Sequence, residues 1–268
     1  RNSMGERVAR PFSIRDAMAI KRLQSQGVAF DLRRLLLYPS SPLQSALLGY
    51  ATHHHWGALT CVQDATPEVE ALGGDLNAST AFGQVWPRTR GRAWDLACLA
   101  PALDGGPKVL DDWLKLLNLF MILGAEQNVQ RVCARSPEDG SVEDALRQAG
   151  FSVLGREQVF ILTASPPPSP CPLGLVPMTE QHRPEVAALS YQVKPRLQQQ
   201  AEAVPECAVS DLYAHIARPG LSQEYVWTVA DRVVAYLGLA RGAGGHWLDI
   251  IVRPDYRGEL SAAIRFVL

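Results

Sequence analysis

A proline-rich stretch divides this chain of 268 residues into two parts. Residues 163–172 read TASPPPSPCP, so five prolines fall within ten positions. Proline has a fixed φ and no backbone N–H, which excludes the stretch from the interior of a helix or a central strand and favours an extended spacer. We therefore expect two folded domains, residues 6–162 and 173–268, joined by a linker over 163–172.

The part before the linker alternates between strand-like and helix-like patterns. Apolar and β-branched runs predict strands at 12–15, 58–62, 81–86, 94–99, 129–134 and 151–162. Apolar side chains at helical spacing predict helices at 17–26, 31–37, 43–50, 109–123 and 142–148. The polar turn 88–91 separates two of the strands as in a β-hairpin. This mixture predicts a mixed α/β fold.

After the linker the same order of elements begins again. Strands are expected at 173–176, 225–230, 233–240 and 247–252, and helices at 184–192 and 211–217. The two parts align through a tryptophan and a proline seven positions apart, which are Trp94 and Pro101 in the first part and Trp247 and Pro254 in the second. Each pair follows a hairpin pattern and precedes a helix pattern, so we interpret the chain as a duplicated domain. The second copy is expected to lack its last strand, helix and strand.

A strand-like run in the second part leads through a basic turn into a helix-like run. Residues 247–252 are largely apolar, Pro254 and Asp255 end the run, and Arg257 and Gly258 precede the next apolar residues. This order places backbone N–H groups and a helix N-terminus where a strand ends, an arrangement that binds anionic phosphates. The segment therefore predicts a pyrophosphate site.

Residues 225–268 resemble the GCN5-related N-acetyltransferase (GNAT) family. In that family the fourth strand hydrogen-bonds the pantetheine arm of acyl-CoA, and the next turn holds the pyrophosphate through the motif [Arg/Gln]-x-x-Gly-x-[Gly/Ala]. The resemblance places the acyl-CoA contacts at Ile250, Ile251, Val252, Arg257, Gly258, Glu259, Leu260, Ser261, Ala262 and Ala263. It implies an α/β fold of two tandem GNAT-like (acyl-CoA N-acyltransferase) units with mixed, mostly antiparallel sheets, the second incomplete at its C-terminus.

Both copies depart from the family motif. In the second copy Leu260 stands at the key glycine position, where its side chain is expected to crowd a phosphate, and Glu259 adds a negative charge. In the first copy Asp104 replaces the basic residue and Pro107 removes an N–H group. The first-copy turn, which ends at Lys108, is either an anion cradle or simply the start of a helix.

The catalytic residues are less clearly marked. The general-acid tyrosine of the family corresponds in the first copy to Leu146, which cannot donate a proton. Glu224, just before a predicted strand, is a weak candidate for a general base that deprotonates an amine through water, and a surface carboxylate is the alternative interpretation.

The resemblance implies an N-acetyltransferase that transfers an acyl group from acyl-CoA, with acetyl-CoA as the expected donor, to an amine of an unidentified acceptor. The alternative is a catalytically inactive GNAT-like protein for binding or scaffolding. The altered glycine motifs favour the alternative, whereas the Arg257–Gly258 turn favours the enzyme. If only one copy binds CoA, we expect it to be the second, because Arg257 attracts a pyrophosphate and Asp104 repels it.

Composition argues against several other classes of protein. A net charge of −1 gives no general attraction to nucleic acid or to an anionic membrane, and no run approaches the roughly 18 apolar residues of a membrane span. His53, His54 and His55 are adjacent and cannot all reach one metal ion, so no metal site is expected. Five scattered cysteines without CxxC spacing suggest reduced thiols in a cytoplasmic protein. The rich use of Ala, Leu, Arg, Gly and Pro suits a bacterial genome. A homodimer is the oligomeric state left open.

Overall fold

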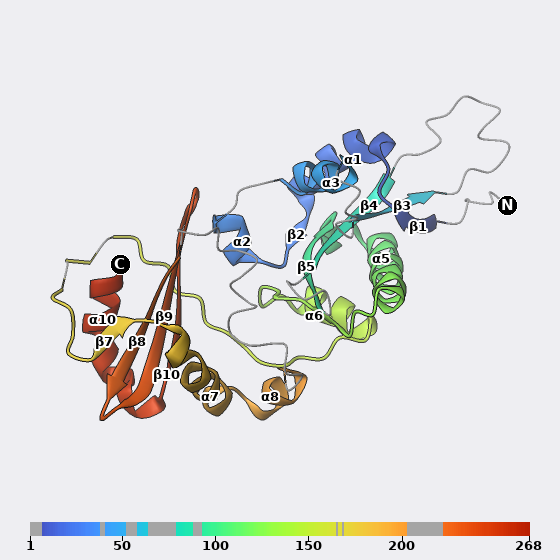
Figure 1. Cartoon of the computed structure of the whole chain (residues 1–268). Helices are drawn as coiled ribbons and strands as arrows, with labels where there is room; N and C mark the ends of the chain where they lie inside the picture. Colours follow the sequence, from blue (N-terminus) through green and yellow to red (C-terminus); the bar gives the residue numbers. More distant parts are fainter. Residues whose placement is uncertain are drawn as a thin grey trace, which may run out of the picture. The chain divides into compact units, whose positions relative to one another are not determined.

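The computed structural model describes residues 7–37, 41–51, 58–63, 79–87, 93–164, 166–167, 169–202 and 222–268. The chain forms two compact units (Figure 1). The first consists of residues 1–32 and 40–152, and the second consists of residues 33–39 and 153–268. The chain therefore contributes a short segment to the second unit before it completes the first.

The first unit contains one sheet. Its strands are β1 (Arg7–Pro11), β2 (Val28–Ala29), β3 (Ala58–Gln63), β4 (Ser79–Pro87), β5 (Ala93–Ala100) and β6 (Arg131–Cys133). The strand order is β1-β3-β4-β5-β2, and β6 pairs with β5 in parallel while the other pairs are antiparallel. A mixed, mostly antiparallel sheet was expected, and this prediction is confirmed. Strands β4 and β5 pair in antiparallel as predicted, and the turn expected at 88–91 lies outside the described residues.

Helices cover this sheet. They are α1 (Ala17–Leu23), α3 (Pro42–Ala51), α5 (Pro107–Glu126) and α6 (Gly140–Gln148), with short 3-10 helices η1 (Ile14–Asp16), η2 (Gln24–Gln26) and η3 (Leu103–Gly105). Helix α5 packs on β1, β3 and β4 (Figure 1). It begins at Pro107, which suits the first helical position, and it buries Trp113, Leu117 and Phe120 at helical spacing. These side chains form the core of the unit.

The prediction of a strand at 12–15 is wrong, because capping interactions start a 3-10 helix there. Ser13 starts the 3-10 helix η1 as its N-cap in a capping box with Asp16. The Asp16 carboxylate is buried and accepts hydrogen bonds from Arg10 at 2.8 and 2.9 Å. A buried carboxylate must keep its hydrogen-bond partners, and this requirement favours the 3-10 helix over the strand that the alternating apolar residues predict.

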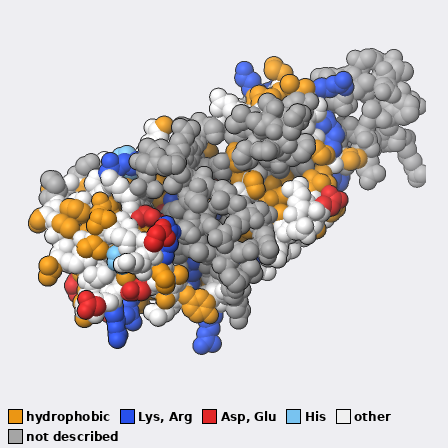
Figure 2. Space-filling view, in the orientation of Figure 1, with side chains coloured by type: hydrophobic (Ala, Val, Ile, Leu, Met, Phe, Trp, Pro, Cys, Tyr) orange, Lys and Arg blue, Asp and Glu red, His pale blue; other side chains and the backbone are white. Residues whose placement is uncertain are grey.

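The strands expected within 151–162 are also wrong, since these residues form neither helix nor strand. Phe160 and Ile161 are each 86% exposed. A strand is stabilised by its partner across the sheet, and strand-like sequence alone does not supply one. Apolar side chains also reach the visible face of the molecule at several other places (Figure 2).

The second unit contains an antiparallel sheet in the order β10-β9-β8-β7. Its strands are β7 (Leu175–Pro177), β8 (Ser222–Val229), β9 (Arg232–Gly242) and β10 (Gly245–Val252). Its helices are α2 (Leu32–Leu37), which begins one residue before the unit does, α7 (Arg183–Val193), α8 (Arg196–Glu202) and α10 (Leu260–Val267), with 3-10 helices η4 (Glu180–His182) and η5 (Pro254–Glu259). The helix expected at 211–217 lies outside the described residues.

Two apolar clusters lie on opposite faces of this second sheet. Helix α10 packs on one face through Leu260, Ala263 and Val267. Helix α7 packs on the other face through Val186 and Leu189. Alternate residues of β10 belong to the two clusters, as the two-residue period of a strand requires. None of the described helices is both long and apolar enough to cross a membrane.

Candidate functional site

The strand proposed to contact the acyl donor lies at one end of the second sheet. Strand β10 pairs with β9, and no other described strand pairs with it. Ile250 is 39% exposed, whereas Ile251 packs toward the α7 cluster and Val252 toward the α10 cluster. The edge of β10 that faces away from β9 thus has no partner among the described strands. Its N–H and C=O groups can therefore bind an extended ligand.

The turn after β10 is formed by η5 and leads directly into α10. Arg257, Gly258, Glu259 and Ser261 are exposed, and Ala262 is half-buried. A Cβ atom placed on Gly258 meets no atom within 4 Å, so the exposed side of the turn has open space. No side chain caps the N-terminus of α10. The turn thus has an exposed guanidinium and an uncapped helix start, both of which attract an anion.

Leu260 and Ala263 lie on the inner side of α10. Leu260 is 6% exposed and Ala263 is 1% exposed, and both pack into the apolar cluster against the sheet. The isobutyl group of Leu260 therefore points into the core and not toward the exposed side of the turn. Glu259 remains the unfavourable feature, because it is exposed on the same turn as Arg257.

Glu224 lies on β8 and is held by a buried tyrosine of the next strand. Tyr236 donates a hydrogen bond from its Oη to Oε1 of Glu224 at 2.7 Å, and Tyr236 is 0% exposed. Glu224 is half-buried, and its second oxygen, Oε2, has no hydrogen bond to a described residue. A carboxylate that is fixed through one oxygen, with the other not hydrogen-bonded to a described residue, is suited to accept a proton.

A second carboxylate lies in the same row of the sheet, where a row means residues that stand opposite one another on neighbouring strands. Gly238 of β9 stands opposite Glu224 of β8 and opposite Asp249 of β10. Asp249 accepts a hydrogen bond from Trp247 Nε1 at 3.0 Å through Oδ1, and its Oδ2 lies 2.9 Å from Arg33 Nη1. Oδ1 of Asp249 is thus hydrogen-bonded, and Oδ2 is in ion-pair contact with Arg33. Of the two carboxylates, Glu224 is the better candidate for a general base.

Arg183, at the start of α7, lies within electrostatic range of this row. The pKa of Arg183 is raised, chiefly by its hydrogen bond to Glu180 and further by the charge of Glu224. The guanidinium donates to Glu180 Oε2 at 2.6 Å. Arg183 thus adds a positive charge on the side of the sheet that carries Glu224.

The sequence interpretation equates β5 of the first unit with β10, and the edge of β5 has strand partners from its own chain. Strand β2 pairs with β5 at Leu99 and Cys98. Two flanking backbone bonds extend this pairing, from Phe30 N to Ala97 O at 2.9 Å and from Ala102 N to Gln26 O at 2.6 Å. Strand β6 pairs with β5 only over residues 93–95. The part of the β5 edge that would accept a ligand is therefore already hydrogen-bonded.

The turn after β5 also differs from the turn after β10. Asp104 is exposed there, where Arg257 stands in the second unit. Gly106 adopts a φ of 85° as the N-cap residue of α5, a conformation that favours glycine, and Pro107 follows it. Leu146 is 7% exposed in the core of the first unit. Of the two turns, only that of the second unit has a basic residue at the first position of the motif, whereas the first turn has Asp104 there and a lysine, Lys108, at its end.

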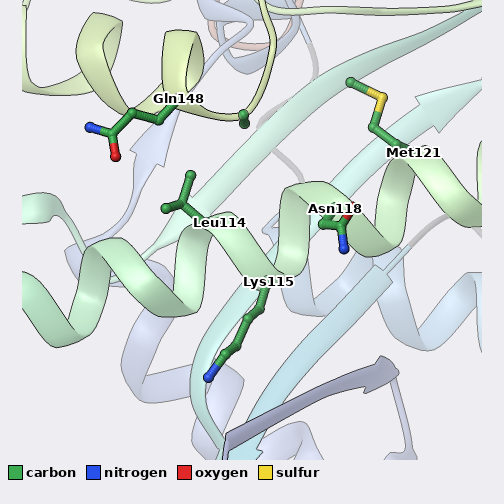
Figure 3. A pocket seen from close by; sticks show the side chains of 6 residues that line it. Leu114, Lys115, Asn118, Met121 and Gln148 are labelled. Atoms are coloured by element: carbon green, nitrogen blue, oxygen red, sulfur yellow. The ribbon is translucent and has the colours of Figure 1, made fainter.

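The first unit has a surface pocket between α5 and the end of α6. Its volume is about 380 Å³, and its lining residues are Leu114, Lys115, Asn118, Met121, Gln148 and Ala149. The Lys115 and Gln148 side chains point away from each other (Figure 3). The lining includes no carboxylate, and its one amine, Nζ of Lys115, is paired with Oδ2 of Asp111 at 2.8 Å.

Metal ligands and the buried thiol of Cys98 are the other groups that bear on chemistry. No group of three or more potential metal ligands occurs among the described residues, and the histidines at 53–55 lie outside them. Burial raises the pKa of the Cys98 thiol to about 12. This cysteine therefore stays protonated near neutral pH and cannot act as a thiolate nucleophile.

Sequence reasoning named Glu224 but missed Tyr236, Gly238, Asp249 and Arg33. The available signal was strand alternation, which places every second residue on one face of the sheet. That signal needs the correct register, and a β-bulge between Trp227 and Thr228 shifts the register of β8 against β9.

The comparisons with known proteins find similarity in solved structures only. No protein-family model and no curated protein matches the sequence. A GCN5-related N-acetyltransferase from Sphaerobacter thermophilus shares 16% identity at a TM-score of 0.42 and covers 96% of this chain and 79% of its own. A second, from Anabaena variabilis, shares 14% identity at a TM-score of 0.38 and covers 98% of this chain and 61% of its own. Both are described as members of the family that the sequence resembles.

Proposed function

We propose that the second unit is an acyl-CoA-dependent N-acyltransferase site. The carrying observation is the Glu224 carboxylate, which is fixed by Tyr236 through one oxygen and has the other without a hydrogen bond to a described residue. It lies two strands from the open edge of β10. With strand spacings near 4.8 Å, this corresponds to about 10 Å across the sheet.

In this proposal acetyl-CoA is the donor. The backbone of Ile250–Val252 hydrogen-bonds the pantetheine arm, and the turn from Arg257 to Ala263 holds the pyrophosphate. The space beside Gly258, the inward Leu260 and the exposed Arg257 support this assignment. Arg257 contributes by charge, and the N-terminal amides of α10 contribute hydrogen bonds.

The chemistry is a direct attack of an amine on the thioester. The amine nitrogen forms a bond to the carbonyl carbon, the C–S bond breaks, and the thiolate that leaves takes up a proton. Glu224 accepts the proton of the amine through water. A backbone N–H of β10 polarises the thioester carbonyl, and the two substrates are held in reacting orientation.

We further propose that the domains 6–162 and 173–268 are both GNAT-like and that the first is non-catalytic. The observation that favours this role is the covering of β5 by β2, which uses the backbone groups that an acyl donor would need. Asp104 and the buried Leu146 agree with it. The first domain would then serve in binding or as a scaffold.

The test compares two charge reversals in the full-length protein. Calorimetry with acetyl-CoA should show that Arg257→Glu weakens binding by about tenfold or more, because removing and reversing a charge at a phosphate exceeds 1.4 kcal/mol. Lys108→Glu, the matched change in the first unit, should leave binding unchanged. If only the Lys108 variant loses binding, the wrong unit has been chosen. If the unaltered protein gives no heat and no thermal shift at millimolar acetyl-CoA, the enzyme proposal fails.

A second assay tests the base. Release of the free CoA thiol would be followed over a panel of primary amines. Glu224→Gln should lower the rate by about 10²-fold or more without changing acetyl-CoA affinity, since the change removes proton acceptance while keeping the shape of the side chain. An unchanged rate would exclude Glu224 as the general base.

A further inference from the structure

An ion pair between a buried arginine and a half-buried aspartate connects helix α2 to β10 within the second unit. The Nη1 atom of Arg33 lies 2.9 Å from Oδ2 of Asp249, and the side chains are 3% and 23% exposed. Trp247 fixes the other oxygen of Asp249. A guanidinium taken out of water to this extent needs a paired charge, and removing one partner of a buried pair is strongly destabilising. Arg33 and Asp249 therefore hold α2 and β10 together.

Backbone hydrogen bonds continue this contact at the tip of the β9–β10 hairpin. The amide of Ala243 donates to Leu37 O at 3.3 Å, and the amide of Gly244 donates to Leu36 O at 3.1 Å. The carbonyls lie in the last turn of α2, where a helix has no partners of its own for them. The hairpin tip thus provides hydrogen-bond donors for the carbonyls at the C-terminal end of α2.

Three glycines at the hairpin tip allow this close approach. A Cβ on Gly242 would overlap the backbone of Leu37, and a Cβ on Gly244 would lie 2.5 Å from Leu36 O. A Cβ on Gly245 would lie 2.9 Å from the Leu36 side chain. Any other residue at these positions forces α2 away. The glycines at the tip therefore leave the space that the end of α2 occupies.

We propose that residues Arg33–Leu37 form a clamp that holds β10 in place, and that Arg33 is a positioning residue for acyl-donor binding through Asp249. The inference rests on the proposed function, in which β10 receives the pantetheine arm. Asp249 lies one residue before Ile250, so its anchoring fixes the strand where the donor would bind. Arg33 itself touches no substrate in this proposal.

The first test is Arg33→Ala in the full-length protein. Hydrogen exchange should speed up by about tenfold or more at the amides of Ala243 and Gly244, because a local opening that loses a buried ion pair becomes easier. Acetyl-CoA affinity by calorimetry should fall by about tenfold, and Arg33→Lys should restore part of both effects. The matched control is Arg241→Ala, which removes the same charge from an exposed position of the same hairpin and should change neither.

A second variant reaches the same contact without changing a charge. Gly244→Ala brings a Cβ against Leu36 O and should speed exchange at Ala243, whereas Gly140→Ala, where a Cβ meets nothing within 4 Å, should not. Unchanged exchange in both Arg33→Ala and Gly244→Ala would overturn the clamp. Faster exchange with unchanged acetyl-CoA affinity would overturn the positioning role. If the unaltered protein binds no acetyl-CoA, the proposed function and the positioning role fail, and the exchange still decides the clamp.

Discussion

Gly238 and Tyr236 should show a strong and non-additive effect on stability. A Cβ on Gly238 would lie 2.6 Å from Oη of Tyr236, the atom that donates to Glu224. Tyr236 is 0% exposed, so its ring has little room to move. Gly238→Ala must therefore displace the hydroxyl group. Alanine is otherwise favoured over glycine in a strand by about 0.5–1 kcal/mol, so a loss of stability would arise from this contact.

The expected magnitude follows from the two interactions that change. Tyr236→Phe removes one hydrogen bond to a charged group and should cost about 1.5 kcal/mol. Gly238→Ala should lose the same bond and add strain, about 3 kcal/mol together. In the double variant the hydroxyl is absent and the nearest ring atom is 3.1 Å from the new Cβ. The double variant should then be about 2 kcal/mol more stable than the sum of the single effects predicts.

Denaturant unfolding of the full-length protein and its three variants measures this coupling. Fluorescence and circular dichroism would give the midpoint and the slope for the transition of the second unit. Coupling energies between residues in contact range over about 0.5–3 kcal/mol, whereas separate sites add within about 0.5 kcal/mol. Additive effects in this cycle would show that Gly238 does not make room for the Tyr236 hydroxyl.

Four further outcomes follow from burial. Leu260→Ala should destabilise the second unit by about 2–4 kcal/mol in the same unfolding assay, because the side chain is 6% exposed, while Leu173→Ala at a 99% exposed position should have almost no effect. Cys98 should resist alkylation at pH 8 until the protein unfolds, whereas exposed Cys171 should react at once, as mass spectrometry would show. Because burial raises the pKa of the Cys98 thiol from 9.0 to about 12, the unfolded chain ionises first, so stability should fall as the pH rises from 9 toward 12. Asp16→Ala should cost about 3–5 kcal/mol, since it leaves a part-buried guanidinium without its carboxylate. Equal stability of the Asp16 variant and the unaltered protein would contradict the role given to that pair.

The sequence predicts the long elements well because their patterns are local. Helix α5 and the hairpins β4–β5 and β8–β9 follow from apolar periodicity and turn residues, which act over a few positions. Strand β2 has only two residues and depends on β5, far along the chain, so no local pattern marks it. The apolar run at 151–162 shows the converse, since its strand-like pattern has no partner.

The candidate site depends on details that periodicity cannot supply. The turn at Ala230 and Asp231, both with positive φ, fixes one end of the β8–β9 register. Without the bulge after Trp227, the count from this turn would place Glu224 opposite Leu237 and not Gly238. A shift of one position moves each side chain to the other face. The row of Glu224, Gly238 and Asp249 is therefore visible only once the bulge is known.

The division of the second unit between residues 33–39 and 153–268 affects the order in which the protein can be made. A ribosome releases α2 long before it reaches the hairpin that receives it. Until then, Arg33 lacks its contact with Asp249, and the carbonyls of Leu36 and Leu37 lack the amides of Gly244 and Ala243. Domains generally fold as units from the N-terminus during synthesis, but this second unit can close only after β10 has emerged. A stop codon or a gene split between residues 152 and 153 would separate α2 from the hairpin that it contacts.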